Sequence, residues 1–141
     1  TVKNAQALGQ ALNELGIDVL CPDLGFTRSH AIAVDVSAHG GGKVVSQDLE
    51  DANIICNKNM LPKDTSAVKP SGIRLGVQEL TRVGMKESEM KEVASLIHRV
   101  VAKKEAPLKV KEDVKLLKKD FTKIRFCFNE GEEAYRFHEL V

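Results

Sequence analysis

Apolar residues recur at intervals of three to four positions in four stretches of the chain, a spacing that places them on one side of an α-helix. Gly16 follows the first stretch and Pro107 the third, and both residue types end helices. The pattern predicts helices over residues 2–15, 43–52, 85–104 and 110–117. The second helix is expected to face inward with Val44, Val45, Leu49 and Ala52.

Short runs that are apolar at nearly every position predict buried strands instead. The run 31–36 is the most continuous and is expected to be the central strand, with further strands at 17–20, 54–56 and 73–76. The glycines at 40–42 predict a flexible turn. Residues 57–72 predict a long irregular loop, and such loops in compact domains are often functional.

Beyond residue 122 the pattern changes again. Alternating Ile124, Phe126 and Phe128 predict a strand, 129–131 a turn, and 132–141 either a strand or a short helix. The whole order is helix, strand, strand, helix, strand, strand, helix, followed by this α/β appendage. It predicts an α+β fold: a small, mostly antiparallel sheet with helices packed on one face.

Composition excludes several classes of protein. The 141 residues fit one domain, with or without an appendage, and 43% are hydrophobic against 29% charged, as in ordinary globular proteins. A net charge of +1 gives no long-range attraction to nucleic acid or to an anionic membrane. No apolar run approaches the roughly 18 residues of a membrane span. The lysine-rich segment 103–123 also contains acids, which indicates a solvated helix face.

The cysteines and histidines form no metal or redox motif. Cys21, Cys56 and Cys127 are odd in number and widely spaced. Cys21 and Cys56 lie in apolar surroundings and are expected to be buried free thiols, which favours a reducing, cytoplasmic location. No metal site is predicted from His39, His98 and His138.

One arginine stands in a distinctive frame within Pro70-Ser71-Gly72-Ile73-Arg74-Leu75-Gly76. The first three residues shape a turn, the β-branched Ile73 begins a strand, and Gly76 allows another backbone or a ligand to come close. A guanidinium fixed at such a bend can bind a carboxylate through two parallel hydrogen bonds, which lysine cannot do.

Further short motifs follow the order of one enzyme family. They are Asn4-Ala5, Ser29-His30 before the strand ending Val34-Asp35-Val36, Gly42-Lys43, Asn57-Lys58-Asn59 and Leu80 to Gly84. Together with the arginine segment, they resemble the small C-terminal domain of serine hydroxymethyltransferase, a pyridoxal-phosphate enzyme of the aspartate aminotransferase fold group. The resemblance covers about residues 2–105. It departs from the family at 37–42 and at 60–69, where the family's common aromatic residue is missing.

The resemblance implies a division of the chain and a role for two residues. Residues 1–105 would be the small domain and 106–141 a basic helix with an α/β appendage, while the large cofactor domain is absent. Arg74 would bind the carboxylate of serine or glycine, and Asn59 the pterin ring of tetrahydrofolate or tetrahydromethanopterin. The electron-sink chemistry belongs to pyridoxal phosphate.

The family's Schiff-base lysine follows a Thr-rich stretch ending His-Lys, and this sequence has no such stretch. The chain is therefore interpreted as a fragment that is inactive alone, from a parent expected to be a homodimer. A non-catalytic module that binds an amino acid or another protein is the alternative. The sequence assigns no catalytic residue.

Three other motifs favour structural roles. Lys58 lies between two asparagines, with no visible cause for the lowered pKa that a nucleophilic lysine needs. His30 is expected to be a hydrogen-bonded structural histidine, because neighbouring Ser29 would point to the opposite side of a strand from it. The Gly40–Lys43 run lacks the first glycine and the hydroxyl residue of a phosphate-binding loop.

Overall fold

An antiparallel sheet of four strands, in the order β1-β2-β4-β3, organises the molecule. The computed structural model describes residues 1–126 and 133–134. Its strands are β1 (Asp18–Val19), β2 (Ala31–Asp35), β3 (Asn57–Asn59) and β4 (Gly72–Gly76). The predicted α+β class and antiparallel sheet are confirmed.

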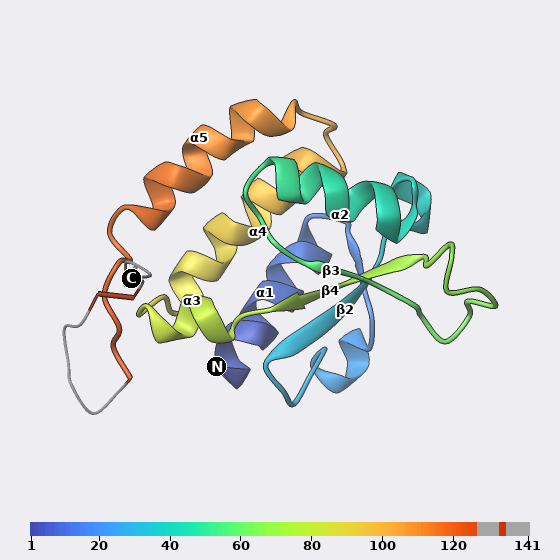
Figure 1. Ribbon diagram of the computed structural model, residues 1–141. Helices are drawn as coiled ribbons and strands as arrows, with labels where there is room; N and C mark the ends of the chain where they lie inside the picture. The colour runs from blue at the N-terminus through green and yellow to red at the C-terminus, as the bar shows by residue number, and fades with distance from the viewer. Residues whose placement is uncertain (127–132, 135–141) are drawn as a thin grey trace, which may run out of the picture.

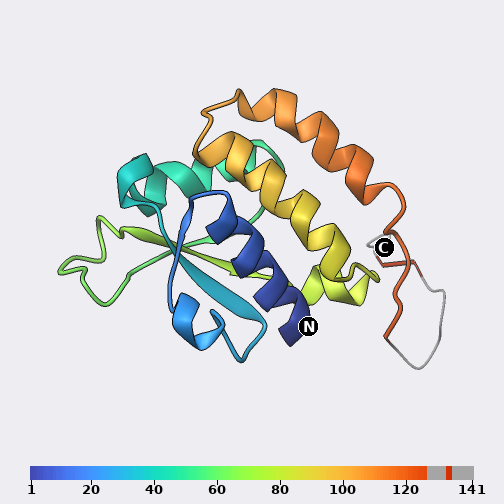
Figure 2. The same cartoon turned by 180° about the vertical axis from the view of Figure 1, so that it is seen from behind.

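Helices α1 (Val2–Glu14) and α4 (Glu87–Val101) lie over one face of this sheet (Figures 1 and 2). Helix α2 (Gly41–Asp51) packs on β3 and β4, and α5 (Pro107–Lys118) packs outside α2 and α4. The short helix α3 (Gln78–Arg82) was not predicted. Two 3₁₀ turns, η1 (Pro22–Leu24) and η2 (Ser37–His39), complete the elements.

Alternation along the two central strands explains the one-sided packing. In β2, Ile32 and Val34 are buried, and in β4, Ile73 and Leu75 are buried beside them. The helices meet these side chains with Leu8, Leu12, Leu49, Met90 and Ile97. Residues two apart in a strand share a face, so the intervening positions form a second face of the sheet. We call this second face the open face.

Two expected positions of apolar residues are wrong. Val44 in α2 is 49% exposed rather than inward-facing. The strand expected at 54–56 lies at 57–59 instead, and Ile55 is 76% exposed. β3 is an edge strand paired with β4 alone, so polar residues can form it. Ile54 and Cys56 still pack against the core, but from the connection before the strand.

Helix α5 adds Val110 and Val114 to the same core as the rest of the chain. The division into 1–105 and 106–141 stays a prediction. After α5, Lys123 forms an isolated antiparallel bridge with Glu133, and Ile124 is buried. The strand expected through Phe128, the turn at 129–131 and the element at 132–141 lie wholly or largely outside the described residues. None of the described helices is long and apolar enough to span a lipid bilayer.

The N-terminus of α2 is pressed against the start of β4. The Gly42 N–H donates to the carbonyl of Pro70 at 2.8 Å, and a Cβ on Gly42 would lie 2.1 Å from the Gly72 carbonyl oxygen. Real Cβ atoms essentially never come so close to backbone, so only glycine fits here. Gly42 is thus required for packing, while Gly40 and Gly41, both with positive φ, form the turn that leads into α2.

A second fixed contact joins α4 to the chain that leads into α5. Arg99 donates from Nε and Nη2 to the two carboxylate oxygens of Glu105, at 2.7 and 2.9 Å, and from Nη1 to Asp113 at 2.7 Å. The hydrogen bonds from Arg99 hold the pKa of Glu105 at about 2, below its ordinary 4.5. Arg99 thereby links three segments of the helical hairpin.

Gly42→Ala should lower the free energy of unfolding by about 3 kcal/mol, because the new methyl group meets backbone that cannot move aside without shifting β4. Urea unfolding followed by circular dichroism measures it. Gly76→Ala is the matched control: its Cβ would meet the far end of the Gln78 side chain, which can rotate away. This control should cost about 1 kcal/mol or less. Equal losses in the two variants would contradict the packing argument.

The Arg99–Glu105 pair should make stability depend on pH in the acid range. A carboxyl whose folded pKa is depressed stabilises fully above its unfolded pKa, near 4.5, and this stabilisation is lost as the pH falls toward 2. Glu105→Gln should therefore lower the melting temperature by a few degrees at pH 6. The gap to the parent should close progressively below pH 4.5. A gap that stays constant down to pH 2.5 would show that the ion pair is not its cause.

Candidate functional site

Arg74 lies on the open face of the sheet, at the middle of β4. Its neighbours Ile73 and Leu75 point into the core, which fixes the strand, while the Arg74 side chain is exposed on the other side. Across the sheet it stands level with Ala33 on β2 and with Asn57 on β3. The motif around Arg74 therefore places a guanidinium on a rigid strand, facing away from the helices.

The two cross-strand neighbours of Arg74 carry no charge. Ala33 offers only a methyl group on one side, and on the other side Asn57 Oδ1 accepts a hydrogen bond from Arg74 Nη2 at 3.4 Å. Within the described part of the chain no carboxylate forms an ion pair with Arg74. The residue borders a groove of about 490 Å³, whose lining also includes the apolar Phe121 and the charged Glu79 and Lys118. Its charge is thus available to an anion.

Asn59 also belongs to the open face, where it stands opposite Gly72. Its side chain is half-buried, and Nδ2 donates to the carbonyl of the next residue, Met60, at 2.7 Å. This bond uses one of the amide's two donors, so one donor and the acceptor oxygen are left for a ligand. Its role in pterin binding stays a prediction.

The loop that leads into the arginine segment is tied together by Asp64. One carboxylate oxygen of Asp64 accepts the N–H of Leu61 at 2.9 Å and the N–H of Ser71 at 2.8 Å. These bonds, first the one from Ser71, lower the pKa of Asp64. Leu61 in turn is buried and packs against Gly72. The loop is consequently ordered at both ends, directly before β4.

A polar cluster at the end of β2 also contacts the loop 60–71, through Lys63. Asp35 forms an ion pair with Lys63 of the loop, and it accepts hydrogen bonds from the Ser37 hydroxyl at 2.6 Å and the Ser37 N–H at 2.9 Å. Partial burial opposes ionisation of Asp35, but the bonds from Lys63 and Ser37 prevail and lower its pKa.

Some expected structural roles are corrected. The His30 side chain is exposed, and it is the backbone carbonyl of His30 that is bonded, accepting the N–H of Val77 at 3.0 Å. Cys21 is exposed rather than buried. Cys56 is largely buried, which raises the pKa of its thiol to about 11, and Cys127 lies outside the described residues. Lys58 is exposed at the sheet edge.

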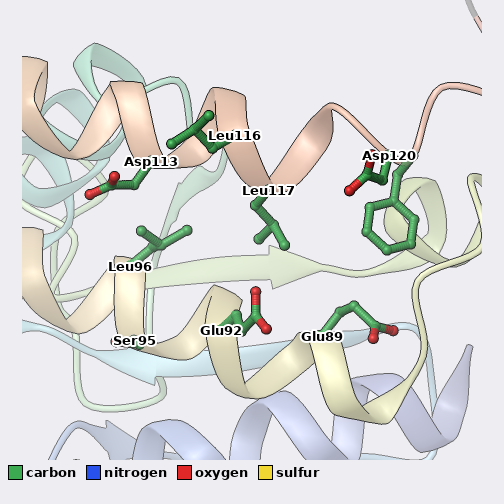
Figure 3. A pocket seen from close by; sticks show the side chains of 9 residues that line it. Glu89, Glu92, Ser95, Leu96, Asp113, Leu116, Leu117 and Asp120 are labelled. Carbon is green, nitrogen blue, oxygen red and sulfur yellow. The ribbon is translucent and has the colours of Figure 1, made fainter.

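A second groove, of about 540 Å³, runs between α4 and α5 and is acidic (Figure 3). Two of its carboxylates already have structural partners. Asp113 binds Arg99, and Glu89 accepts the N–H of Lys86 at 2.7 Å at the start of α4. Among the described residues, no group of three or more histidine, cysteine or acidic side chains is arranged to hold a metal ion.

The described residues do not fit a complete site for pyridoxal phosphate. Every described lysine is exposed except the half-buried Lys111 on α5, so none offers the buried amine that a Schiff base requires. The N-terminus of α2 could have bound a phosphate, but the Pro70 carbonyl and the Gly72 backbone occupy it. A cofactor would have to be held by other parts of a larger protein.

The helix-backed antiparallel sheet matches the fold of the small domain of aminotransferase-like pyridoxal-phosphate enzymes, as a comparison with solved structures shows. The solved structure of L-threonine transaldolase from Pseudomonas fluorescens superposes with a TM-score of 0.75 at 34% identity, over 85% of this chain and 27% of that one. The family model described as serine hydroxymethyltransferase matches residues 1–97. The chain belongs to the serine hydroxymethyltransferase family.

Curated relatives carry the same family name. The serine hydroxymethyltransferase of Methanocella arvoryzae is 56% identical over 96% of this chain, and that of Thermoplasma volcanium 51% identical over 99%. The match covers 32% and 33% of their lengths, in their C-terminal portion. This chain thus spans about a third of the curated relatives it matches.

Sequence reasoning did not find Asn57, Asp64 or the Asp35–Lys63 pair as parts of this site. The contact of Asn57 with Arg74 depends on the register of two strands separated by a loop, which the sequence pattern does not give. Asp64 carried a local signal: an aspartate in a loop commonly accepts backbone N–H groups a few residues away.

Asp64→Ala should loosen the loop while leaving the core folded, because two backbone N–H groups lose their shared acceptor. Hydrogen exchange at the amides of Leu61 and Ser71 should accelerate by roughly an order of magnitude. Exchange at the buried amides of β2 should stay the same. Thr65→Ala, an exposed neighbour in the same loop, is the control and should change neither. Unchanged protection at Ser71 in Asp64→Ala would show that the carboxylate does not order the loop.

Proposed function

We propose that this chain is the C-terminal domain of a serine hydroxymethyltransferase, an enzyme that interconverts serine and glycine. The one-carbon unit would pass to tetrahydrofolate or tetrahydromethanopterin. The support is family membership together with the match to the C-terminal third of the relatives. Pyridoxal phosphate and the Schiff-base lysine would be supplied by the preceding large domain, so the isolated chain would be inactive.

Arg74 is the residue through which this domain would act. Its positive charge stands on a rigid strand with no acid neutralising it among the described residues, and this single observation carries the proposal. The guanidinium can bind the two oxygens of an amino-acid carboxylate through parallel hydrogen bonds. Anchored in this way, the substrate would have its Cα held in one orientation, and correct placement of reacting groups can lower a barrier by several kcal/mol.

Asn59 would contribute a second contact, to the pterin ring of the cosubstrate. The free donor and acceptor of its amide suit a ring with nitrogen and carbonyl groups. The missing aromatic residue in loop 60–69 would alter the surroundings of that ring relative to the family. The parent enzyme is proposed to be a homodimer in the cytoplasm.

Arg74→Gln in the full-length enzyme should reduce kcat/KM for serine by about 100-fold or more, since two charge-assisted hydrogen bonds are lost. Arg74→Lys keeps the positive charge but loses the paired N–H donors of the guanidinium. Its kcat/KM for serine should lie between those of Arg74→Gln and the parent. Arg82→Gln is the control, because Arg82 is exposed and pairs with Glu79 on α3. It should change kcat/KM by about twofold or less.

Two results would overturn the proposal. The first is full serine–glycine conversion by this 141-residue chain alone, which would contradict its role as a part. The second is an unchanged kcat/KM in Arg74→Gln. Titration of the chain with glycine or serine, followed by NMR chemical shifts, separates the alternative of an amino-acid sensor. Tight binding by the chain alone favours the sensor, whereas an enzyme part should bind weakly because most substrate contacts lie elsewhere.

A further inference from the structure

Asn57 is the described side chain that touches the guanidinium of Arg74. Strands β3 and β4 pair antiparallel, and the register puts the Cα of Asn57 directly opposite the Cα of Arg74. Paired residues of an antiparallel sheet project from the same face, so both side chains stand on the open face. The 3.4 Å hydrogen bond from Arg74 Nη2 to Asn57 Oδ1 connects them.

The chemistry of this partner distinguishes it from an ion pair. An amide oxygen accepts a hydrogen bond but carries no net charge, so it orients the guanidinium without neutralising it. A carboxylate in the same place could fill both arms of the fork and compete with an incoming carboxylate. Asn57 engages a single N–H of the five that arginine offers, and Ala33, paired with Arg74 on the other neighbouring strand, has no side-chain acceptor for the others.

The neighbouring residues of β3 do not share this contact. Asn59 bonds to the carbonyl of Met60, and Lys58 stands level with the buried Ile73 on the other face of the sheet. An arginine side chain loses rotamer freedom when it grips a ligand, and a prior hydrogen bond reduces that loss.

We propose that Asn57 is a positioning residue, which holds the guanidinium of Arg74 in the orientation that receives an amino-acid carboxylate. The inference rests on the proposed function of Arg74. It adds that the carboxylate site consists of a charged binder and a neutral support on the adjacent strand. An uncharged partner is a requirement of the site, and replacing it with an isosteric acid should be more harmful than removing it.

The test compares Asn57→Ala, Asn57→Asp and Lys58→Ala in the full-length enzyme, with KM and kcat for serine measured separately. Asn57→Ala should raise KM about threefold with kcat little changed, as when a contact shared by ground and transition states is weakened. Asn57→Asp has the same shape but a negative charge. It should raise KM about tenfold or more, because the new carboxylate would bind the N–H donors of Arg74 in place of the substrate carboxylate. Lys58→Ala should match the parent. A purely structural role for Asn57 would instead make the isosteric aspartate the milder change.

A second measurement does not need activity. In the 141-residue chain, ¹⁵N NMR of the arginine side chains should show the Arg74 signal shifted in Asn57→Ala and unshifted in Lys58→Ala. If both Asn57 variants keep the parent's KM and the Arg74 signal does not move, the inference is wrong. If Arg74→Gln fails while the Asn57 variants do not, the proposed function stands and only the support role falls. If Arg74→Gln itself has no effect, both fall together.

Discussion

The backbone contact between the N-terminus of α2 and the start of β4 determines where the open face places its side chains. Gly42 has no Cβ, and this lets the first turn of α2 approach the Pro70–Gly72 turn. The same turn is held from two further directions, by the Val36 N–H on the Ser71 carbonyl at 3.0 Å and by Asp64 on the Ser71 N–H. Because three contacts fix this turn, β4 can pair with its neighbouring strands in only one register.

That register links core packing to the site. Because side chains alternate along a strand, burying Ile73 and Leu75 under the helices obliges Arg74 to face the other way. Apolar burial, the largest stabilising term, therefore also aims the guanidinium. A slip of one residue would bury Arg74 and expose two core positions, so stability of the fold and placement of the charge are the same requirement.

The features of this fold that depend on local sequence pattern could be predicted from the sequence. The α+β class, the central strand and the arginine segment all follow from periodicity and turn residues close together in the chain. The remaining errors come from tertiary context. β3 is built from Asn57, Lys58 and Asn59, which have poor strand propensity, because β4 supplies its hydrogen bonds at the sheet edge. The exposure of Val44 and the close packing of Gly42 depend on the neighbouring elements, so the sequence pattern alone cannot predict them.

Two arginines of the chain show why partner charge, rather than residue type, separates a structural from a functional role. Arg99 donates two hydrogen bonds to Glu105 and a third to Asp113. Two carboxylates therefore neutralise its charge, and these ion pairs join α4 to α5. Arg74 has one neutral amide as its partner and a methyl group on its other side. Arg99 is also the more buried of the two, whereas the Arg74 side chain is exposed on the open face. A guanidinium that stands on a paired strand and has no carboxylate partner can bind the carboxylate of a ligand, and of these two arginines only Arg74 meets this condition.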